Sequence, residues 1–125
     1  MIVLDSSALV ALLLREPGHE MVAGRLAEAA VSAVNISEVL ARMSRENISP
    51  RALLPRLLQL GTSIVAFDAA QAVIASEIRE RARGLGMGLA DCCCLALAIH
   101  RGTPVMTADR AWNGLEVDLQ IVMIR

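Results

Sequence analysis

The chain has 125 residues, 55% of them hydrophobic, and a formal net charge of −1. This length predicts a single domain spanning residues 1–125, and a mean hydropathy of +0.54 excludes intrinsic disorder. The near-zero net charge gives no electrostatic sign of nucleic-acid binding. All twelve basic residues are arginines, which either suit bidentate phosphate contacts or reflect genomic codon bias.

Several classes of protein are disfavoured by simple features of the sequence. No run of about 18 uninterrupted apolar residues predicts a membrane span. The opening segment lacks the basic start of a secretory signal, and Asp5 interrupts its apolar run. Phe67 and Trp112 are the only aromatic residues, which excludes a base-stacking platform. The consecutive cysteines Cys92–Cys94 fit neither a zinc site nor a disulfide framework, so we expect a cytoplasmic protein in which they pack as apolar residues.

The first half of the chain alternates short apolar segments with helical segments. In chain order, the pattern predicts a strand at 2–4, a helix from Asp5-Ser6-Ser7 to residue 14, a helix at 19–30 after a break at Pro17-Gly18, a strand at 31–34, and a helix from an Asn35 cap to residue 45.

The second half continues the alternation. It predicts a helix from Ser49-Pro50 to about residue 60, a strand at 63–67, a helix from a capping box at Asp68–Gln71 to residue 83, a glycine loop at 84–88, a helix at 91–101, a strand at 104–107, a turn at 109–114 and a strand at 119–124. Alternating strands and helices predict the α/β class, with a mainly parallel sheet covered on both faces.

Four acidic residues occupy related places in this pattern. Asp5 follows the first strand, Glu38 lies in the first turn of the helix after the second strand, Asp91 opens the helix before the fourth strand, and Asp109 closes that strand. Each also has an ordinary structural explanation when taken alone. Asp5 and Asp91 suit helix N-caps, Glu38 suits a capping box with Asn35, and Asp109 suits a turn.

Taken together, the four acids predict a site at one edge of the sheet. Strand ends and helix starts collect there in an open α/β sheet, and ligands bind where the strand order switches. Crowded carboxylates repel one another and favour a divalent cation, and oxygen ligands without a nearby His or Cys suit Mg²⁺ or Mn²⁺. Such a site can hydrolyse a phosphodiester with metal-activated water. His19 and His100 lie outside the motifs and are expected at the surface and in a last helical turn.

Five short motifs occur in chain order: MIVLDSSAL at the start, NISE at 35–38, GLAD at 88–91, LALA at 95–98 and TADRAW at 107–112. Together they extend over nearly the whole chain. They resemble the motifs of the PIN-domain ribonucleases, and most of all those of the VapC-type toxins of toxin–antitoxin pairs.

The resemblance implies a three-layer α/β/α domain and a ribonuclease that depends on Mg²⁺ or Mn²⁺. It matches Asp5, Glu38, Asp91 and Asp109 to the family's metal-binding and catalytic acids, and Ser7 and Thr107 to supporting polar residues. It also implies an RNA substrate, an antitoxin protein as partner, and a homodimer or a heteromer with the antitoxin. The cysteines after Asp91 depart from the pattern, since relatives often have a basic or small residue there.

Three alternative functions account less well for the same residues. A phosphate-accepting receiver domain needs a lysine, which is absent, and a haloacid-dehalogenase-type phosphatase needs Asp-x-Asp where Ser7 stands. A non-catalytic RNA-binding PIN domain would usually lack one of the acids.

Two sets of side chains are predicted to bind partners. For RNA phosphates the candidates are Arg42, Arg45 and Arg110. A second set consists of apolar residues that form either a groove for the antitoxin or part of the hydrophobic core, since their spacing suits both. These residues are Val39, Leu40, Met43, Leu53, Leu54 and Leu57.

Overall fold

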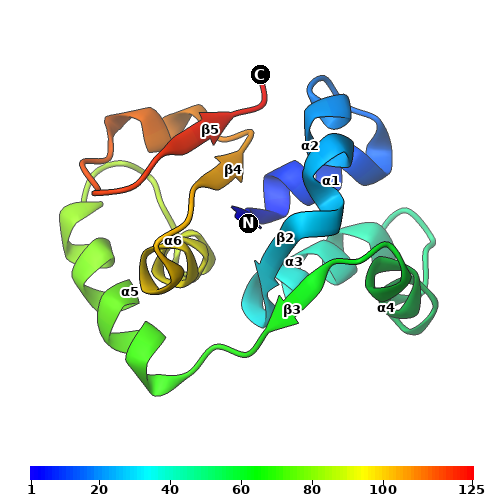
Figure 1. The fold of residues 1–125 in the computed structure, drawn as a ribbon, viewed down its shortest axis with the longest axis horizontal. Coiled ribbons are helices and arrows are strands. Elements are labelled where there is room, and N and C mark those ends of the chain that lie inside the picture. Colours follow the sequence, from blue (N-terminus) through cyan, green and yellow to red (C-terminus); the bar gives the residue numbers. More distant parts are fainter.

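The computed structural model describes residues 1–125 and contains five parallel strands in the order β3-β2-β1-β4-β5 (Figure 1). The strands are β1 (Ile2–Leu4), β2 (Ala29–Ser32), β3 (Ser63–Val65), β4 (Val105–Thr107) and β5 (Ile121–Met123). The helices are α1 (Ser6–Leu14), α2 (His19–Arg25), α3 (Ala33–Ser44), α4 (Pro50–Gln59), α5 (Ala69–Arg81) and α6 (Leu89–Arg101), with two 3₁₀ helices, η1 (Leu26–Glu28) and η2 (Arg110–Gly114). The predicted α/β class and parallel sheet are confirmed.

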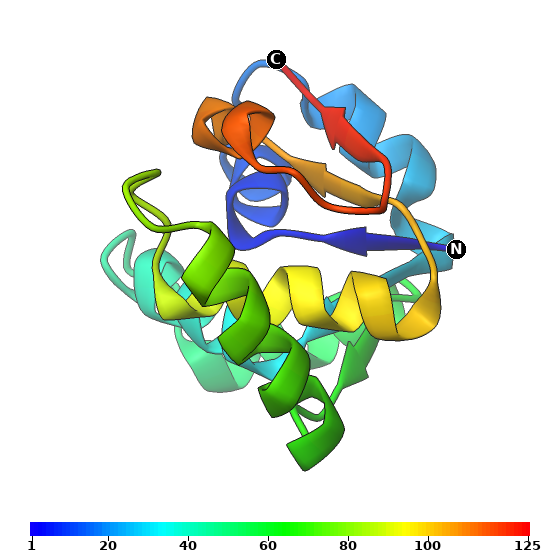
Figure 2. The same cartoon turned by 90° about the vertical axis from the view of Figure 1, so that its left-hand side faces the viewer.

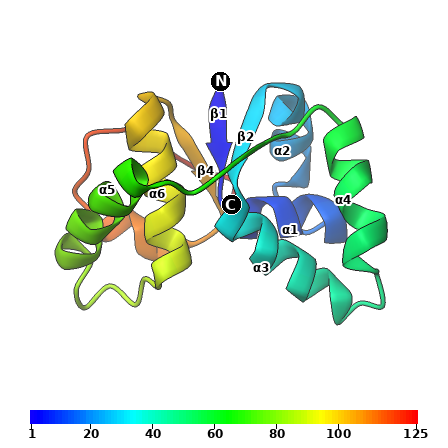
Figure 3. The same ribbon diagram turned by 90° about the horizontal axis from the view of Figure 1, so that it is seen from below.

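Helices cover both faces of the sheet, as a parallel sheet requires. Figure 3 shows α5 and α6 on one side, and α1 to α4 on the other. A hydrophobic core lies on each face of the sheet, and alternate residues of β1 contribute to the two cores. Ile2 and Leu4 pack with α1 to α4, whereas Val3 packs with α5 and α6. The three-layer α/β/α arrangement is therefore confirmed.

The strand order switches between β1 and β4. From β1 the chain moves outward through β2 to β3, and the last two strands then pair on the other side of β1. Residues that follow β1 and β4 therefore flank the switch point, where open α/β sheets bind ligands. Asp5 follows β1 directly, and Asp109 lies two residues beyond the end of β4.

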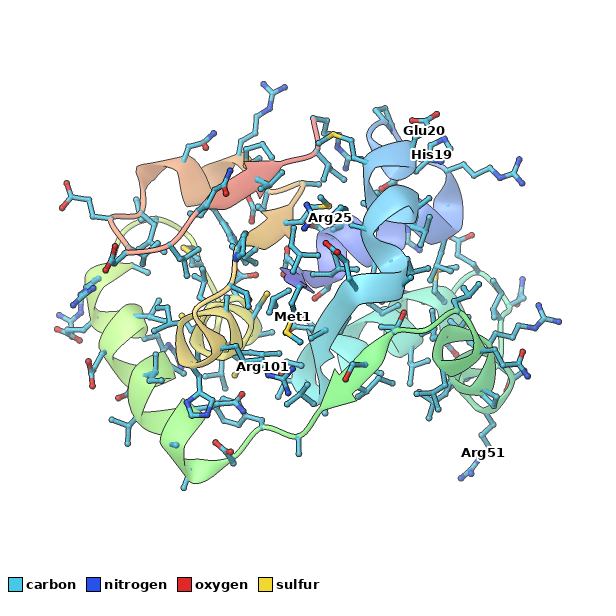
Figure 4. All side chains as sticks on the ribbon, viewed as in Figure 1. Met1, His19, Glu20, Arg25, Arg51 and Arg101 are labelled. Atoms are coloured by element: carbon cyan, nitrogen blue, oxygen red, sulfur yellow. The ribbon has the colours of Figure 1, made fainter.

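Helix α6 returns antiparallel to the strands across one face of the sheet (Figure 2). Its last residue, Arg101, lies at the amino end of β1, where its Nη1 is 3.5 Å from the Met1 sulfur (Figure 4). The first turn of α6, which carries Asp91, consequently lies at the opposite edge, with the carboxyl ends of the strands.

The predicted boundaries around β2 are wrong. The helix expected at 19–30 ends at Arg25, and η1 and β2 follow; the strand expected at 31–34 is Ala29–Ser32. The alanines of this stretch favour helix by propensity, but Ala29 and Ala30 pair with β1 and are buried. Tertiary pairing thus outweighs local preference.

The start of α3 is also corrected. Ser32, not Asn35, is the N-cap, and its side chain accepts a hydrogen bond from the Val34 N–H at 3.3 Å. Asn35 lies inside the first turn, and Glu38 lies in the second turn rather than the first. The capping box predicted between Asn35 and Glu38 therefore does not exist.

Smaller corrections concern other element ends. Helix α6 begins at Leu89 rather than Asp91, and β3, β4 and β5 are each shorter than predicted. Asp68 caps α5 by accepting from the Gln71 N–H at 2.9 Å, but the Gln71 side chain donates to the Ala66 carbonyl instead of completing a capping box.

The apolar residues of α3 and α4 belong to the core. Val39, Met43, Leu53 and Leu57 are buried, and Leu40 and Leu54 pack against the same cluster. The core alternative is thus right for Val39, Met43, Leu53 and Leu57, whereas a groove at the partly buried Leu40 and Leu54 stays a prediction. No helix combines the length and apolar character needed to cross a membrane.

Candidate active site

Asp5 is the most buried of the four acids. It occupies the position before α1, yet its side chain makes no capping bond. Only 3% of the residue is exposed, and its Oδ1 atom has no hydrogen-bond partner. A carboxylate oxygen without a partner in the interior costs free energy, so the fold holds Asp5 in a position that is unfavourable for stability alone.

Ser7 and Thr107 hold the other oxygen of Asp5. The hydroxyls of Ser7 and Thr107 donate to Oδ2 at 2.7 and 3.0 Å. The same hydroxyls accept from the N–H groups of Ala108, at 2.9 Å, and Asp109, at 3.0 Å. The two side chains predicted to support the site therefore tie Asp5 to the segment that follows β4.

Glu38 reaches the site from α3 and is fixed through one oxygen. Its Oε1 accepts hydrogen bonds from the Ser6 hydroxyl and from Asn35 Nδ2, the latter at 3.3 Å. Its Oε2 accepts no hydrogen bond from the protein. Glu38 is exposed, so this second oxygen is available to a ligand.

Asp91 and Asp109 complete the group of four acids, and each also accepts a hydrogen bond from a nearby backbone N–H. Asp91 Oδ2 accepts from the Gly88 N–H at 2.9 Å, which anchors the glycine loop to α6. Asp109 Oδ1 accepts from the Ala111 N–H at 3.0 Å and caps η2. These ordinary roles coexist with the site, since each bond occupies only one carboxylate oxygen.

The charges of the four acids act on one another. Burial raises the pKa of Asp5 to about 6, opposed by the Ser7 hydrogen bond and reinforced by the charge of Asp91. Burial also raises the pKa of Asp91, with further contributions from the charges of Asp109 and Glu38. None of the five ion pairs in the structure involves these four acids. Asp91 is thus the centre of an uncompensated negative cluster.

The site fits a divalent cation in its chemistry. The donors are all oxygens, Asp5 Oδ1 has no partner, and no arginine neutralises the cluster. No group of three or more His, Cys, Asp or Glu side chains is placed to hold a metal ion together. Mg²⁺ does not require such a group, because it is usually held by one or two carboxylates, with water and substrate phosphate completing its octahedron. Asp5 and Asp91, whose charges interact, suit that role.

A hollow of about 310 Å³ opens beside Glu38 between α1 and α3. Its lining residues are Ser6, Ser7, Val10, Glu16, Glu38, Arg42, Arg45 and Arg125. Arg42 and Arg45 therefore line the same hollow as Glu38, the one acid of the four that does so, and Arg110 does not line it. None of the other three hollows in the structure is lined by any of the four acids.

The sequence predicts no site role for three residues of this region. It places Asn35 at a helix cap and Ser6 in a helix start, and nothing in the pattern distinguishes Arg125. The polar character of Ser6 and Asn35 was visible in the sequence, but their convergence depends on the packing of α1 against α3. Arg125 reaches the hollow because its guanidinium is held by the Pro17 carbonyl, at 3.1 Å, and by Glu16, at 3.5 Å.

The histidines and cysteines take no part in the site. His19 lies on α2 with its Nε2 3.1 Å from Glu20 (Figure 4), and His100 is exposed near the end of α6. Cys92, Cys93 and Cys94 are buried and free, and burial raises the pKa of each thiol. The prediction that they pack as small apolar residues is confirmed.

The fold is shared with solved chains from toxin–antitoxin systems. A toxin–antitoxin complex from Klebsiella pneumoniae matches at 16% identity, covering 100% of this chain and 98% of that one, with a TM-score of 0.75. FitAcB from Neisseria gonorrhoeae matches at 24% identity, covering 99% and 98%, with a TM-score of 0.70. VapC20 from Mycobacterium tuberculosis, described as a toxin that cleaves the sarcin–ricin loop, matches at 17% identity, covering 93% and 97%, with a TM-score of 0.72. At these identities the likeness concerns the fold.

Sequence comparison with curated proteins finds no match. The family model named PIN domain matches residues 2–116, which include all four acids and both supporting hydroxyls. With the parallel sheet, the switch point and the acids gathered there, this match means that the chain belongs to the PIN-domain family of nucleases.

Proposed function

We propose that this protein is an endoribonuclease dependent on Mg²⁺ or Mn²⁺, and that it acts as the toxin of a toxin–antitoxin pair. The observation that carries the proposal is the buried Asp5 carboxylate, with one oxygen held by Ser7 and Thr107 and the other without a partner. A group so arranged, beside Asp91 and without a countercharge, is typical of a site for a divalent cation.

Asp5 and Asp91 would bind the ion, and Glu38 and Asp109 would border it. A divalent cation held there would activate water and stabilise the charge that develops when a phosphodiester is displaced in line. Ser7 and Thr107 keep Asp5 Oδ2 occupied, which leaves Oδ1 as the oxygen that the ion would bind. The free Oε2 of Glu38 can orient the attacking water or accept its proton.

The residues available also favour one type of product. Cleavage through the 2′-hydroxyl usually needs a general acid and base that titrate near neutral pH, most often histidines. His19 and His100 lie outside the site, and the chain has no tyrosine or lysine. Attack by water at phosphorus, with departure of the 3′-oxygen, leaves a 5′-phosphate and a 3′-hydroxyl.

Arg42 and Arg45 are the proposed phosphate contacts. Both line the hollow that begins at Glu38, so an RNA strand lying in the hollow would bring a phosphate to the acids. Arg42 is paired with Glu46 at 2.6 Å, while Arg45 has no acidic partner and can bind phosphate without breaking an ion pair. Arg110, which is exposed, remains a candidate from sequence alone.

The toxin role is supported by the solved structures that share this fold. The similar solved chains include a complex from Klebsiella pneumoniae described as toxin and antitoxin, and a VapBC from Rickettsia felis bound to promoter DNA. A partner of this kind, an antitoxin that covers the acidic site, is proposed for this chain too, as is self-association into a homodimer. The cytoplasm is the compartment proposed for such a pair.

The proposal is tested by metal binding and cleavage together. Mn²⁺ should raise the melting temperature of the wild-type protein, because it relieves repulsion among the acids. Asp5→Asn should lose most of that shift. A labelled RNA should be cut in Mg²⁺ and left intact in EDTA or by Asp91→Asn. Equal metal shifts in wild type and Asp5→Asn, or cleavage that persists in EDTA, would contradict the proposal.

A further inference from the structure

Asn35 is the point at which three elements of the site meet. It is fully buried in the first turn of α3, and its Nδ2 atom faces three acceptors. These are Ser6 Oγ at 3.1 Å, Glu38 Oε1 at 3.3 Å and the Ala90 carbonyl oxygen at 3.1 Å. They belong to α1, α3 and α6 respectively.

Each partner of Asn35 is one of the acids or its neighbour in the chain. Ser6 follows Asp5, Ala90 precedes Asp91, and Glu38 is contacted directly. Ser6 in turn donates to the same Glu38 oxygen that Asn35 contacts. One amide thus connects the backbone or side chain of three acid-bearing segments that lie far apart in the sequence.

The orientation of the amide is set by these partners. Were it turned over, the Asn35 carbonyl oxygen would face the Glu38 carboxylate and the Ala90 carbonyl, which are acceptors only. As it stands, Asn35 Oδ1 is buried with no partner, as is Asp5 Oδ1. An unpartnered buried acceptor lowers stability, so the position of Asn35 is not explained by folding alone.

The chemistry of an amide suits this place. An arginine would cancel the negative charge that a cation needs, and an aspartate would bring a fifth carboxylate with no hydrogen to donate. The Asn35 N–H groups fix Glu38 Oε1 while leaving Oε2 free and the charge of the cluster unchanged. Hydrogen bonds that orient metal-binding side chains, without contacting the metal themselves, commonly change metal affinity.

We infer that Asn35 is a positioning residue that holds Glu38 and the start of α6 at a fixed separation, so that Glu38 borders the divalent cation that Asp5 and Asp91 would bind. The inference rests on the nuclease function proposed above. The positioning role differs from a purely structural one, in which Asn35 would only stabilise the packing of α1, α3 and α6 against one another.

The experiment compares Asn35→Ala with Met43→Ala, a control on the same helix. Met43 is buried in the core away from the hollow, so its truncation destabilises the fold without touching the site. We expect Asn35→Ala to raise the Mn²⁺ dissociation constant, measured by thermal-shift titration, by about tenfold or more. The kcat on RNA should fall by about tenfold, with KM changed by less than about twofold. Met43→Ala should lose thermal stability but keep wild-type values for metal and RNA.

A second variant keeps the test informative if Asn35→Ala folds poorly. Ser6→Ala removes another hydrogen bond to Glu38 from a partly exposed position, and it should raise the Mn²⁺ dissociation constant about threefold. Wild-type Mn²⁺ affinity in the two site variants, with loss of melting temperature alone, would overturn the inference and leave the proposed function standing. A wild-type protein that neither binds Mn²⁺ nor cuts RNA would overturn both.

Discussion

Asp5 combines a buried carboxylate with a raised pKa, and the two follow from its surroundings. Burial disfavours the charged form, and Asp91 adds repulsion, while Ser7 and Thr107 stabilise the charge with hydrogen bonds. The result is an acid that titrates near pH 6 in the folded protein without metal. A cation would compete with the proton for this group, so metal affinity is expected to fall below that pH.

The titration of Asp5 predicts how stability changes with pH. Its pKa is higher in the folded state than in the unfolded chain, so its contribution favours folding at low pH and is lost as pH rises from about 4 to about 6. Two pKa units correspond to at most about 3 kcal/mol. Without metal, Asp5→Asn should therefore raise the free energy of unfolding at pH 7.5 by about 1 to 2 kcal/mol.

Denaturant unfolding of wild type and Asp5→Asn in EDTA, from pH 4.5 to 7.5, measures this directly. The difference between the two proteins should grow as pH rises and become constant above about pH 7. A lower stability of Asp5→Asn at pH 7.5 would show that the charged Asp5 stabilises the fold, contrary to this account.

Among the secondary-structure elements, α3 contributes residues of several kinds to the site and to the hollow beside it. It supplies Glu38 to the acids, Asn35 to the hydrogen bonds behind them, and Arg42 and Arg45 to the hollow. These residues are three or four positions apart, so they lie along one side of the helix, while Val39 and others face the core. A single amphipathic helix thus serves both packing and chemistry.

We predict that RNA binds in the hollow beside α3. Arg45→Gln should raise the RNA dissociation constant several-fold and lower the salt dependence of binding by about one unit of slope, because one phosphate contact is lost. Arg51, which extends outward from α4 (Figure 4), provides the matched control. Fluorescence anisotropy in a range of salt concentrations measures both. Equal effects of Arg45→Gln and Arg51→Gln would exclude the hollow as the path of the RNA.

The positions of Asp5 and Asp109 after strands could be predicted from the sequence more accurately than the helix boundaries around them. Asp5 and Asp109 follow strands of a parallel sheet, and the ends of such strands share one edge whatever the details of the helices. The start of α3 could not be placed, because the pairing of Ala29 and Ala30 with β1 depends on a distant strand. The role of Asn35 could not be predicted for the same reason, since two of its hydrogen-bond partners lie in α1 and α6.

For the whole molecule, the parallel sheet and the return of α6 bring the four acids to one edge. If they form the active site of a toxin, expression without an antitoxin should arrest growth. Asp91→Asn or Asp109→Asn should restore growth while circular dichroism shows an intact fold. Arg51→Gln should remain toxic, since Arg51 is exposed on α4 and lines none of the hollows. Toxic Asn variants would place the activity elsewhere.

The central claim is that the acids act through a divalent cation and water, and the ends of the cleaved RNA test it most directly. A labelled RNA is incubated with the wild-type protein and Mg²⁺, and the new ends are mapped by ligation and mass spectrometry. The account predicts 5′-phosphate and 3′-hydroxyl ends, because water attacks phosphorus and the 2′-hydroxyl takes no part. Ends carrying a 2′,3′-cyclic phosphate would contradict it.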